Sequence, residues 1–138
     1  MTTIAPIQTT GAPMSSTAKI SITDVRKVFP LKNEEFVALE QVSLDIDDNE
    51  FVTVVGPSGC GKSTLMNILA GLETVTSGSA RVDGVEVDGP GPERGVIFQQ
   101  YALFPWLTVR QNVEFGLSVA KVPKKERRER AEHFIRMV

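Results

Sequence analysis

Nine residues, GPSGCGKST from Gly56 to Thr64, combine the residue types that bind phosphate. Their three glycines allow backbone N–H groups to curl around an anion without interference from Cβ atoms. Lys62 adds a positive charge, and the Ser63 hydroxyl is a suitable ligand for Mg²⁺. The segment matches G-x-x-x-x-G-K-[ST] at every fixed position, which predicts a P-loop around the β- and γ-phosphates of a nucleoside triphosphate. The predicted phosphate-binding residues are Gly56, Pro57, Ser58, Gly59, Cys60, Gly61, Lys62, Ser63 and Thr64.

Two elements are expected to position this loop, a strand before it and a helix after it. Residues 51–55 (FVTVV) are apolar except at Thr53 and mostly β-branched, which predicts a strand covered on both faces. A helix beginning near Lys62 would direct free N–H groups and its positive dipole end at the phosphates. Its predicted buried stripe is Leu65, Ile68, Leu69 and Leu72. This strand–loop–helix context favours a phosphate site over the alternative, a tight turn without a ligand.

Further strands are predicted from alternation and turn chemistry. Residues 20–25 and 42–46 alternate apolar and polar side chains, and a polar loop, LKNEEF, separates the two segments. Asp83–Gly84 between short valine-containing runs predicts a two-residue hairpin turn. Residues 95–98 (GVIF) predict another short strand.

Two helices are predicted near the C-terminal end of the sequence. Thr108 and Gln111 fit a capping box that opens a helix across Val109, Val113 and Leu117. Pro123 suits the first turn of a second helix, with supportive pairs at Glu126–Arg130 and Glu132–Arg136. The predicted apolar stripe of this helix is Ala131, Phe134, Ile135 and Val138.

Composition limits the remaining possibilities. A chain of 138 residues suits one domain, and 41% hydrophobic with 23% charged residues is typical of a globular protein. The net charge of −2 provides no general attraction to nucleic acid or anionic membranes. The lysines and arginines of 121–130 alternate with glutamates, which predicts a solvated helix face with His133 exposed. Cys60 is the single cysteine, so no internal disulfide framework is expected, and residues 1–18 predict a disordered tail.

From about Lys19 to Val138 the chain resembles the N-terminal half of the ATP-binding subunit of ABC transporters. The resemblance rests on the order of GPSGCGKST, then ILAGLE, the SGSARVDG hairpin and VIFQQYALFPWLTVRQNVEFGL, which looks like the Q-loop of the family. The combination of GPGPERGVIFQ with LFPWLTV further resembles the nitrate, sulfonate and taurine importers. The resemblance implies an α/β fold: a P-loop NTPase core with an added antiparallel β subdomain and the start of a helical subdomain.

The resemblance also implies roles for individual residues. Gln99 matches the Q-loop glutamine, which in the family contacts Mg²⁺ and the attacking water, so Lys62 and Gln99 are the catalytic candidates and Ser63 and Gln99 the metal ligands. Phe29 occupies the place of the aromatic residue that stacks on adenine, although Phe36 competes for this role. Residues 103–106 (LFPW) would form either a local mini-core or part of the docking groove for the membrane subunits.

The expected cofactors are ATP and Mg²⁺. The expected partners are transmembrane permease subunits and a second ATP-binding subunit, with peripheral association at the cytoplasmic face of the membrane and no nucleic acid. The sequence contains no match to the signature motif LSGGQ, the Walker B strand with its catalytic glutamate, or the switch histidine. Residues 19–138 are therefore expected to be an incomplete, truncated ATP-binding domain that carries half of a catalytic site. The alternative is a nucleotide-binding module that does not hydrolyse ATP.

Overall fold

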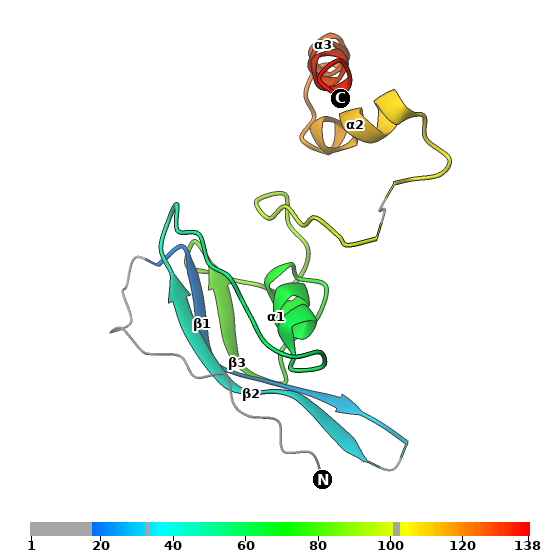
Figure 1. Ribbon diagram of the computed structural model, residues 1–138. Coiled ribbons are helices and arrows are strands. Elements are labelled where there is room, and N and C mark those ends of the chain that lie inside the picture. Colours follow the sequence, from blue (N-terminus) through cyan, green and yellow to red (C-terminus); the bar gives the residue numbers. More distant parts are fainter. Residues whose placement is uncertain (1–17, 33, 101–102) are drawn as a thin grey trace. The chain divides into compact units, whose positions relative to one another are not determined.

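In the computed structural model, the two alternating segments upstream of the P-loop pair as a long antiparallel hairpin (Figure 1). Strand β1 spans Ile20–Pro30 and strand β2 spans Glu35–Ile46, which confirms both predicted strands. The second strand begins well before the predicted 42–46, because Phe36 and Glu35 pair with Phe29 and Pro30 of β1. The LKNEEF loop is correspondingly shorter than expected from its polarity.

The structure describes residues 18–32, 34–100 and 103–138, and the chain divides into two units, Met1–Gly91 and Pro92–Val138. The predicted disordered tail lies outside the described residues except at Ala18. In the first unit, the described strands form a four-stranded antiparallel sheet of order β2-β1-β3-β4. Strand β1 therefore lies between β3 and β2, the strand that precedes the P-loop in the sequence.

The Asp83–Gly84 turn joins β3 (Ser77–Val82) to β4 (Val85–Glu86) as the sequence predicts. Asp83 has φ of 51° and Gly84 has φ of 74°, so both central residues adopt the left-handed conformation of a type I′ turn. This turn matches the twist of the flanking strands, which explains why the dipeptide alone identified the hairpin.

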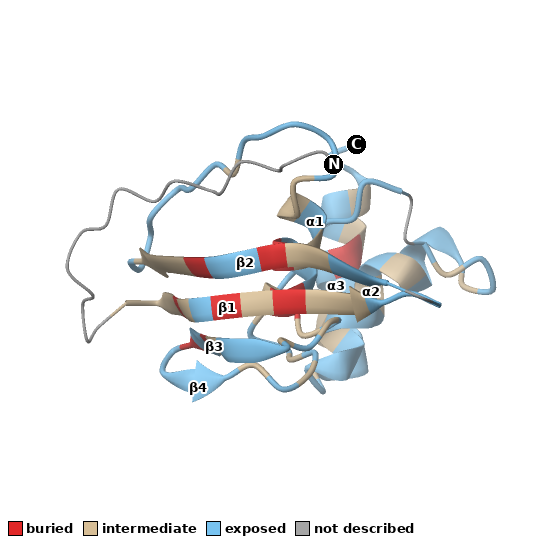
Figure 2. Cartoon of the chain, turned by 90° about the horizontal axis from the view of Figure 1, so that it is seen from below, coloured by how far each residue is buried: buried red, intermediate tan, exposed pale blue. Residues whose placement is uncertain are grey.

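The core of the first unit lies between the sheet and helix α1 (Lys62–Leu69), whose start confirms the predicted position (Figure 2). Leu65 and Ile68 are buried, and Leu69 packs at the edge of the core, but Leu72 is 50% exposed, so its predicted burial is wrong. The helix ends at Leu69, and Gly71 turns the chain with φ of 73°. The buried sheet residues of this cluster are Ile22, Val25, Leu39, Val42 and Ala80.

Two predicted strands, at 51–55 and 95–98, are wrong. Neither segment pairs with any strand in the described part of the chain. Phe51 is 92% exposed, Val55 82% and Ile97 100%, so these apolar runs are uncovered as well as unpaired. Their β-branched composition creates a preference for extended backbone, but a strand also requires a hydrogen-bonding neighbour.

The second unit contains helices α2 (Val109–Val119) and α3 (Lys124–Ile135). The capping box is confirmed: Thr108 Oγ1 accepts from Gln111 N at 3.3 Å, and Thr108 N donates to Gln111 Oε1 at 2.8 Å. Pro123 is the N-cap of α3, one position before the predicted first turn. An Arg110–Glu132 ion pair at 2.6 Å links the two helices.

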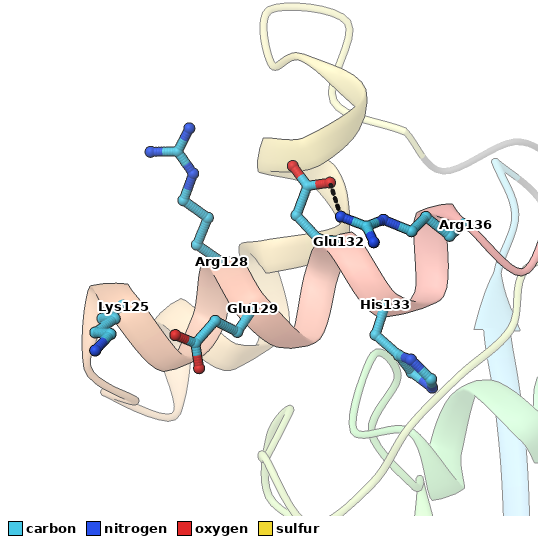
Figure 3. Close-up of a pocket in the computed structure, with 6 residues that line it drawn as sticks. All are labelled: Lys125, Arg128, Glu129, Glu132, His133 and Arg136. Atoms are coloured by element: carbon cyan, nitrogen blue, oxygen red, sulfur yellow. Dashed lines mark ion pairs between the residues drawn. The ribbon is translucent and has the colours of Figure 1, made fainter.

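Helix α3 buries little of its predicted apolar stripe. Ala131 is fully buried and Ile135 half-buried, whereas Phe134 is 58% exposed and Val138 lies beyond the helix end. The predicted Glu126–Arg130 ion pair is present, and the Glu132–Arg136 pair has an N–O distance of 4.0 Å. Figure 3 shows the charged face, with acidic and basic side chains interspersed and His133 exposed as predicted. The residues lining an open pocket of about 450 Å³ on this face are Lys125, Arg128, Glu129, Glu132, His133 and Arg136.

Candidate nucleotide-binding site

The glycines of the P-loop meet conformational demands that other residues resist. Gly59 and Gly61 have φ of 82° and 95°, in the left-handed region that a Cβ atom disfavours. A Cβ on Gly61 would lie 2.5 Å from the carbonyl oxygen of Ala38 and 2.6 Å from Leu39 Cδ2. Gly61 therefore permits two things at once, the turn into helix α1 and close packing of the loop against strand β2.

Lys62 reaches back over the loop that precedes it. Its Nζ donates to the carbonyl oxygens of Gly56 at 2.8 Å and Pro57 at 2.7 Å. The half-buried Cys60 places its Sγ 3.6 Å from the same ammonium group. The side chain of Lys62 thus carries a positive charge to the centre of the glycine-rich loop.

A pocket of about 500 Å³ opens beside the loop, large enough for part of a nucleotide. Strand β2 contributes Phe36 and Ala38, and the P-loop with the start of α1 contributes the rest. The loop and helix residues that line it are Ser58, Gly59, Gly61, Lys62, Ser63 and Thr64. Ser63 is exposed at this surface, so its hydroxyl is accessible to a cation that accompanies phosphate.

The start of α1 adds backbone donors to the same pocket. The first N–H groups of a helix have no partner within the helix, and they carry the positive end of its dipole. Within the described chain, no side chain caps this end of α1, and its first residues, Lys62, Ser63 and Thr64, all line the pocket. Glycine backbone, helix terminus and lysine together form an arrangement that suits a polyphosphate.

Phe29 and Phe36, the two aromatic candidates for adenine, are directly opposite each other across β1 and β2. Opposite residues of an antiparallel pair project from the same face of the sheet. Phe36 is 43% exposed and lines the pocket beside the P-loop, whereas Phe29 is half-buried and is not among the lining residues. The Lys27 ammonium lies 4.9 Å from the centroid of the Phe29 ring. The choice between the two rings stays a prediction.

Sequence reasoning missed a partly buried ion pair beside Phe29. Lys27 is only 7% exposed, and its Nζ bonds to Glu73 Oε1 at 2.6 Å. This hydrogen bond, and a second from the Thr74 N–H, lower the pKa of Glu73 below its usual value. A signal was available, because Lys27 follows Val25 by two residues and so falls on the buried face of β1.

Gln99 lies in the second unit, in an exposed bend after residues 95–98. The P-loop belongs to the first unit, so the predicted contact of Gln99 with Mg²⁺ stays a prediction.

The LFPW segment forms a small aromatic cluster anchored by a helix residue. The Phe104 ring lies 4.5 Å from Phe115 and 5.4 Å from Trp106, measured between centroids. Asn112 fixes the loop, since its Oδ1 accepts from Phe104 N at 2.8 Å and its Nδ2 donates to three carbonyls, those of Phe104, Leu107 and Thr108. Leu103 and Trp106 stay 68% and 75% exposed beside a groove of about 330 Å³. The segment is therefore both a local mini-core and an exposed apolar surface.

Membrane-spanning helices and metal-binding clusters were sought among the described residues. None of their helices has the length and apolar content needed to cross a membrane. Nor do these residues include a cluster of three or more histidine, cysteine or carboxylate side chains able to hold a metal ion.

Comparison with known proteins identifies the family. Residues 39–138 match the family model described as ABC transporter. The chain belongs to this family. Among solved structures, the ATP-binding cassette MJ0796 in a dimeric, post-hydrolysis state bound to ADP and Pi superposes with a TM-score of 0.76 at 34% identity. That match covers 86% of this chain and 56% of the cassette, and it confirms the expected fold, a P-loop ABC cassette with an antiparallel sheet.

Curated relatives agree with the structural match. A putative ATP-binding protein of Brucella abortus is 66% identical over 103 residues, covering 75% of this chain and 40% of the relative. The nitrate import ATP-binding protein NrtD of Synechocystis is 50% identical over 119 residues, covering 86% and 45%. The bicarbonate transport ATP-binding protein CmpC of Synechococcus elongatus is 43% identical over 122 residues, covering 86% and 18%. The chain thus spans less than half the length of these relatives.

Proposed function

We propose that this chain is the ATP- and Mg²⁺-binding portion of the ATP-binding subunit of an ABC importer, with residues 19–138 forming the N-terminal part of that domain. The observation that carries the proposal is the pocket in which Lys62, two left-handed glycines and the start of helix α1 converge. A tight turn without a ligand would not need a lysine and the N-terminus of a helix to line the same pocket. ABC family membership supplies the identity of the nucleotide.

Within this proposal, different residues hold the phosphates, the cation and the base. Backbone N–H groups of residues 56 and 58–64 hold the phosphates, and the Lys62 ammonium exchanges its carbonyl partners for phosphate oxygens. The Ser63 hydroxyl would hold Mg²⁺, joined by the Gln99 amide oxygen. When bound, Mg²⁺ neutralises negative charge on the phosphates. Phe29 stacks on adenine, with Phe36 as the neighbouring alternative on the same sheet face.

The residues of this chain bind and orient the nucleotide, but hydrolysis needs more. Phosphoryl transfer to water also requires a group that positions the attacking water, and Gln99 is the proposed contributor from this chain. The remaining contributors would come from the rest of a complete domain and from a second ATP-binding subunit. This requirement agrees with the dimeric state named for the MJ0796 cassette.

A permease subunit is the proposed membrane partner. The exposed Leu103 lines an apolar groove that Asn112 holds in shape, which suits a short apolar helix of such a subunit. Docking there would place the chain peripherally at the cytoplasmic face of the membrane. For the solute, we propose a small anion of the nitrate, sulfonate or taurine type, supported by similarity to the nitrate protein NrtD and the bicarbonate protein CmpC.

Multiple-turnover ATPase assays of the chain, alone and mixed with a full-length subunit of the same family, test the proposal. We expect Mg·ATP binding without sustained turnover by the chain alone, and turnover that depends on Lys62 in the mixture. Binding without turnover in both assays would favour the non-hydrolysing module. Absence of Mg·ATP binding would overturn both functions.

A further inference from the structure

The Phe29 ring has one face occupied by a buried cation. Lys27 Nζ lies 4.9 Å from the ring centroid, and the lysine is 7% exposed. An ammonium group over an aromatic face is attracted by the ring's electrons, most strongly where water is excluded. The cation lies against one of the two faces of the Phe29 ring, which is half-buried.

Glu73 holds that cation in place. Its Oε1 accepts from Lys27 Nζ at 2.6 Å and from Thr74 N at 3.1 Å, so the carboxylate is itself fixed to its own backbone. Lys27 therefore has two partners, a carboxylate and an aromatic ring, and little freedom to leave either. A lysine on a buried strand face needs this kind of compensation for its charge.

The segment that carries Glu73 is fastened to β1 on both sides of Lys27. Thr76 N donates to the carbonyl oxygen of Arg26 at 2.8 Å, and Val28 N donates to Thr76 Oγ1 at 3.0 Å. This segment follows directly from helix α1, whose first residue is Lys62. A continuous set of contacts thus joins the phosphate end of the site, through α1 and Glu73, to Lys27 and Phe29.

We infer that Lys27 is a positioning residue for the nucleotide base: anchored by Glu73, it fixes the orientation of the Phe29 ring so that the ring face away from Lys27 receives adenine. This inference rests on the proposed role of Phe29 in stacking on adenine. A ring held in its binding orientation loses less freedom when the ligand arrives, so affinity rises without an additional contact. Lys27 contributes to recognition of the base and not to binding of the phosphates.

Comparing two ligands distinguishes positioning from general support of the fold. Calorimetric titrations of the full chain with Mg·ATP and with inorganic tripolyphosphate separate affinity for the base from affinity for the phosphates. Lys27→Met should weaken ATP binding about three- to tenfold, the effect of one cation–π contact, with tripolyphosphate affinity unchanged. Lys27→Arg, which retains a charge able to stack on the ring and pair with Glu73, should keep most of the ATP affinity. Lys19→Met is the matched control, because Lys19 pairs with Asp83 near the other end of β1 and makes no cation–π contact with any ring among the described residues.

A double-substitution cycle ties the effect to the ring. In a Phe29→Ala background, Lys27→Met should weaken ATP binding no further. Glu73→Gln should show the same ligand pattern at smaller size, which provides a second test should Lys27→Met fail to fold. Equal loss of affinity for both ligands, an undiminished loss in the Phe29→Ala background, or no effect of Phe29→Ala on ATP would overturn the inference. The P-loop proposal would survive these results provided that Lys62→Ala still weakens both ligands, and it fails separately if Lys62→Ala changes neither.

Discussion

Gly61 shows how a single residue satisfies the loop and the fold together. Its φ of 95° turns the chain into α1, and the absence of a side chain allows β2 to approach. Gly59, at φ of 82°, has the same conformational demand, but a Cβ there would meet nothing within 4 Å. Substitution of Gly59 therefore tests backbone strain alone, and substitution of Gly61 tests backbone strain together with a steric clash.

Gly61→Ala should destabilise the chain more than Gly59→Ala does. Left-handed backbone alone should make Gly59→Ala about 1–2 kcal/mol less stable. Gly61→Ala adds a clash with backbone of β2, which cannot move as a flexible side chain can. Urea unfolding of the two variants measures the difference, and equal free energies of unfolding would contradict the packing of Gly61 against β2.

Cys60 offers a chemical probe of the same loop. It is half-buried between the Gly56 backbone and the Lys62 ammonium, so a bulky adduct on its sulfur would intrude into the phosphate cradle. Labelling by a bulky thiol reagent should block ATP binding, and saturating Mg·ATP should slow the labelling. The rate of label incorporation, followed by mass, is the measurement. Equal rates with and without ATP would count against the placement of Cys60 in the nucleotide site.

At the scale of elements, the join between β1 and the segment after α1 depends on a titratable group. The hydrogen bond from Lys27, followed by that from the Thr74 N–H, lowers the pKa of Glu73 below its usual 4.5. Because the folded-state pKa lies below the unfolded one, the stabilisation is fully present above pH 4.5 and is lost as the pH falls through the lower, folded-state value.

Glu73→Gln should therefore remove a pH-dependent part of the stability. Well above the usual glutamate pKa, the variant should be less stable than the parent chain, and the difference should shrink as the medium is acidified. Denaturant unfolding of both chains across this range is the measurement, and the matched pair cancels the titration of the other carboxylates. A difference in unfolding free energy that stays constant with pH would show that the Lys27–Glu73 pair does not couple to folding.

For the whole molecule, local chemistry predicted most of what was found. Interactions between residues close in sequence determine three features: the P-loop, the Asp83–Gly84 turn and the Thr108 capping box. These features can therefore be predicted from the sequence alone. The strand predicted at 51–55 failed because its formation depends on a distant pairing partner, which β-branched composition does not supply. The Lys27–Glu73 pair was missed for the same reason, since its members are 46 positions apart in the sequence.

Two of the predicted site residues, Phe36 and Gln99, could not be placed from local sequence patterns. The pocket lining brings Phe36 to the P-loop through the register of β1 and β2, a pairing that residue types did not fix. Gln99 belongs to a different unit from Lys62, and its role follows from resemblance to the family. The conformation of the P-loop is thus the part best predicted from sequence, and the place of Phe36 beside it is what the structure adds.

Calorimetric titration with Mg·ATP of the parent chain and of Lys62→Ala is the decisive measurement for a phosphate-binding P-loop. The parent chain should bind, and Lys62→Ala should bind well over tenfold more weakly, because a charged donor is removed from a site built around phosphate. Lys19→Ala, which removes an exposed lysine paired with Asp83, serves as the control and should leave affinity unchanged. An affinity for Mg·ATP that is the same with and without the Lys62 ammonium would show that this loop does not bind the phosphates of ATP.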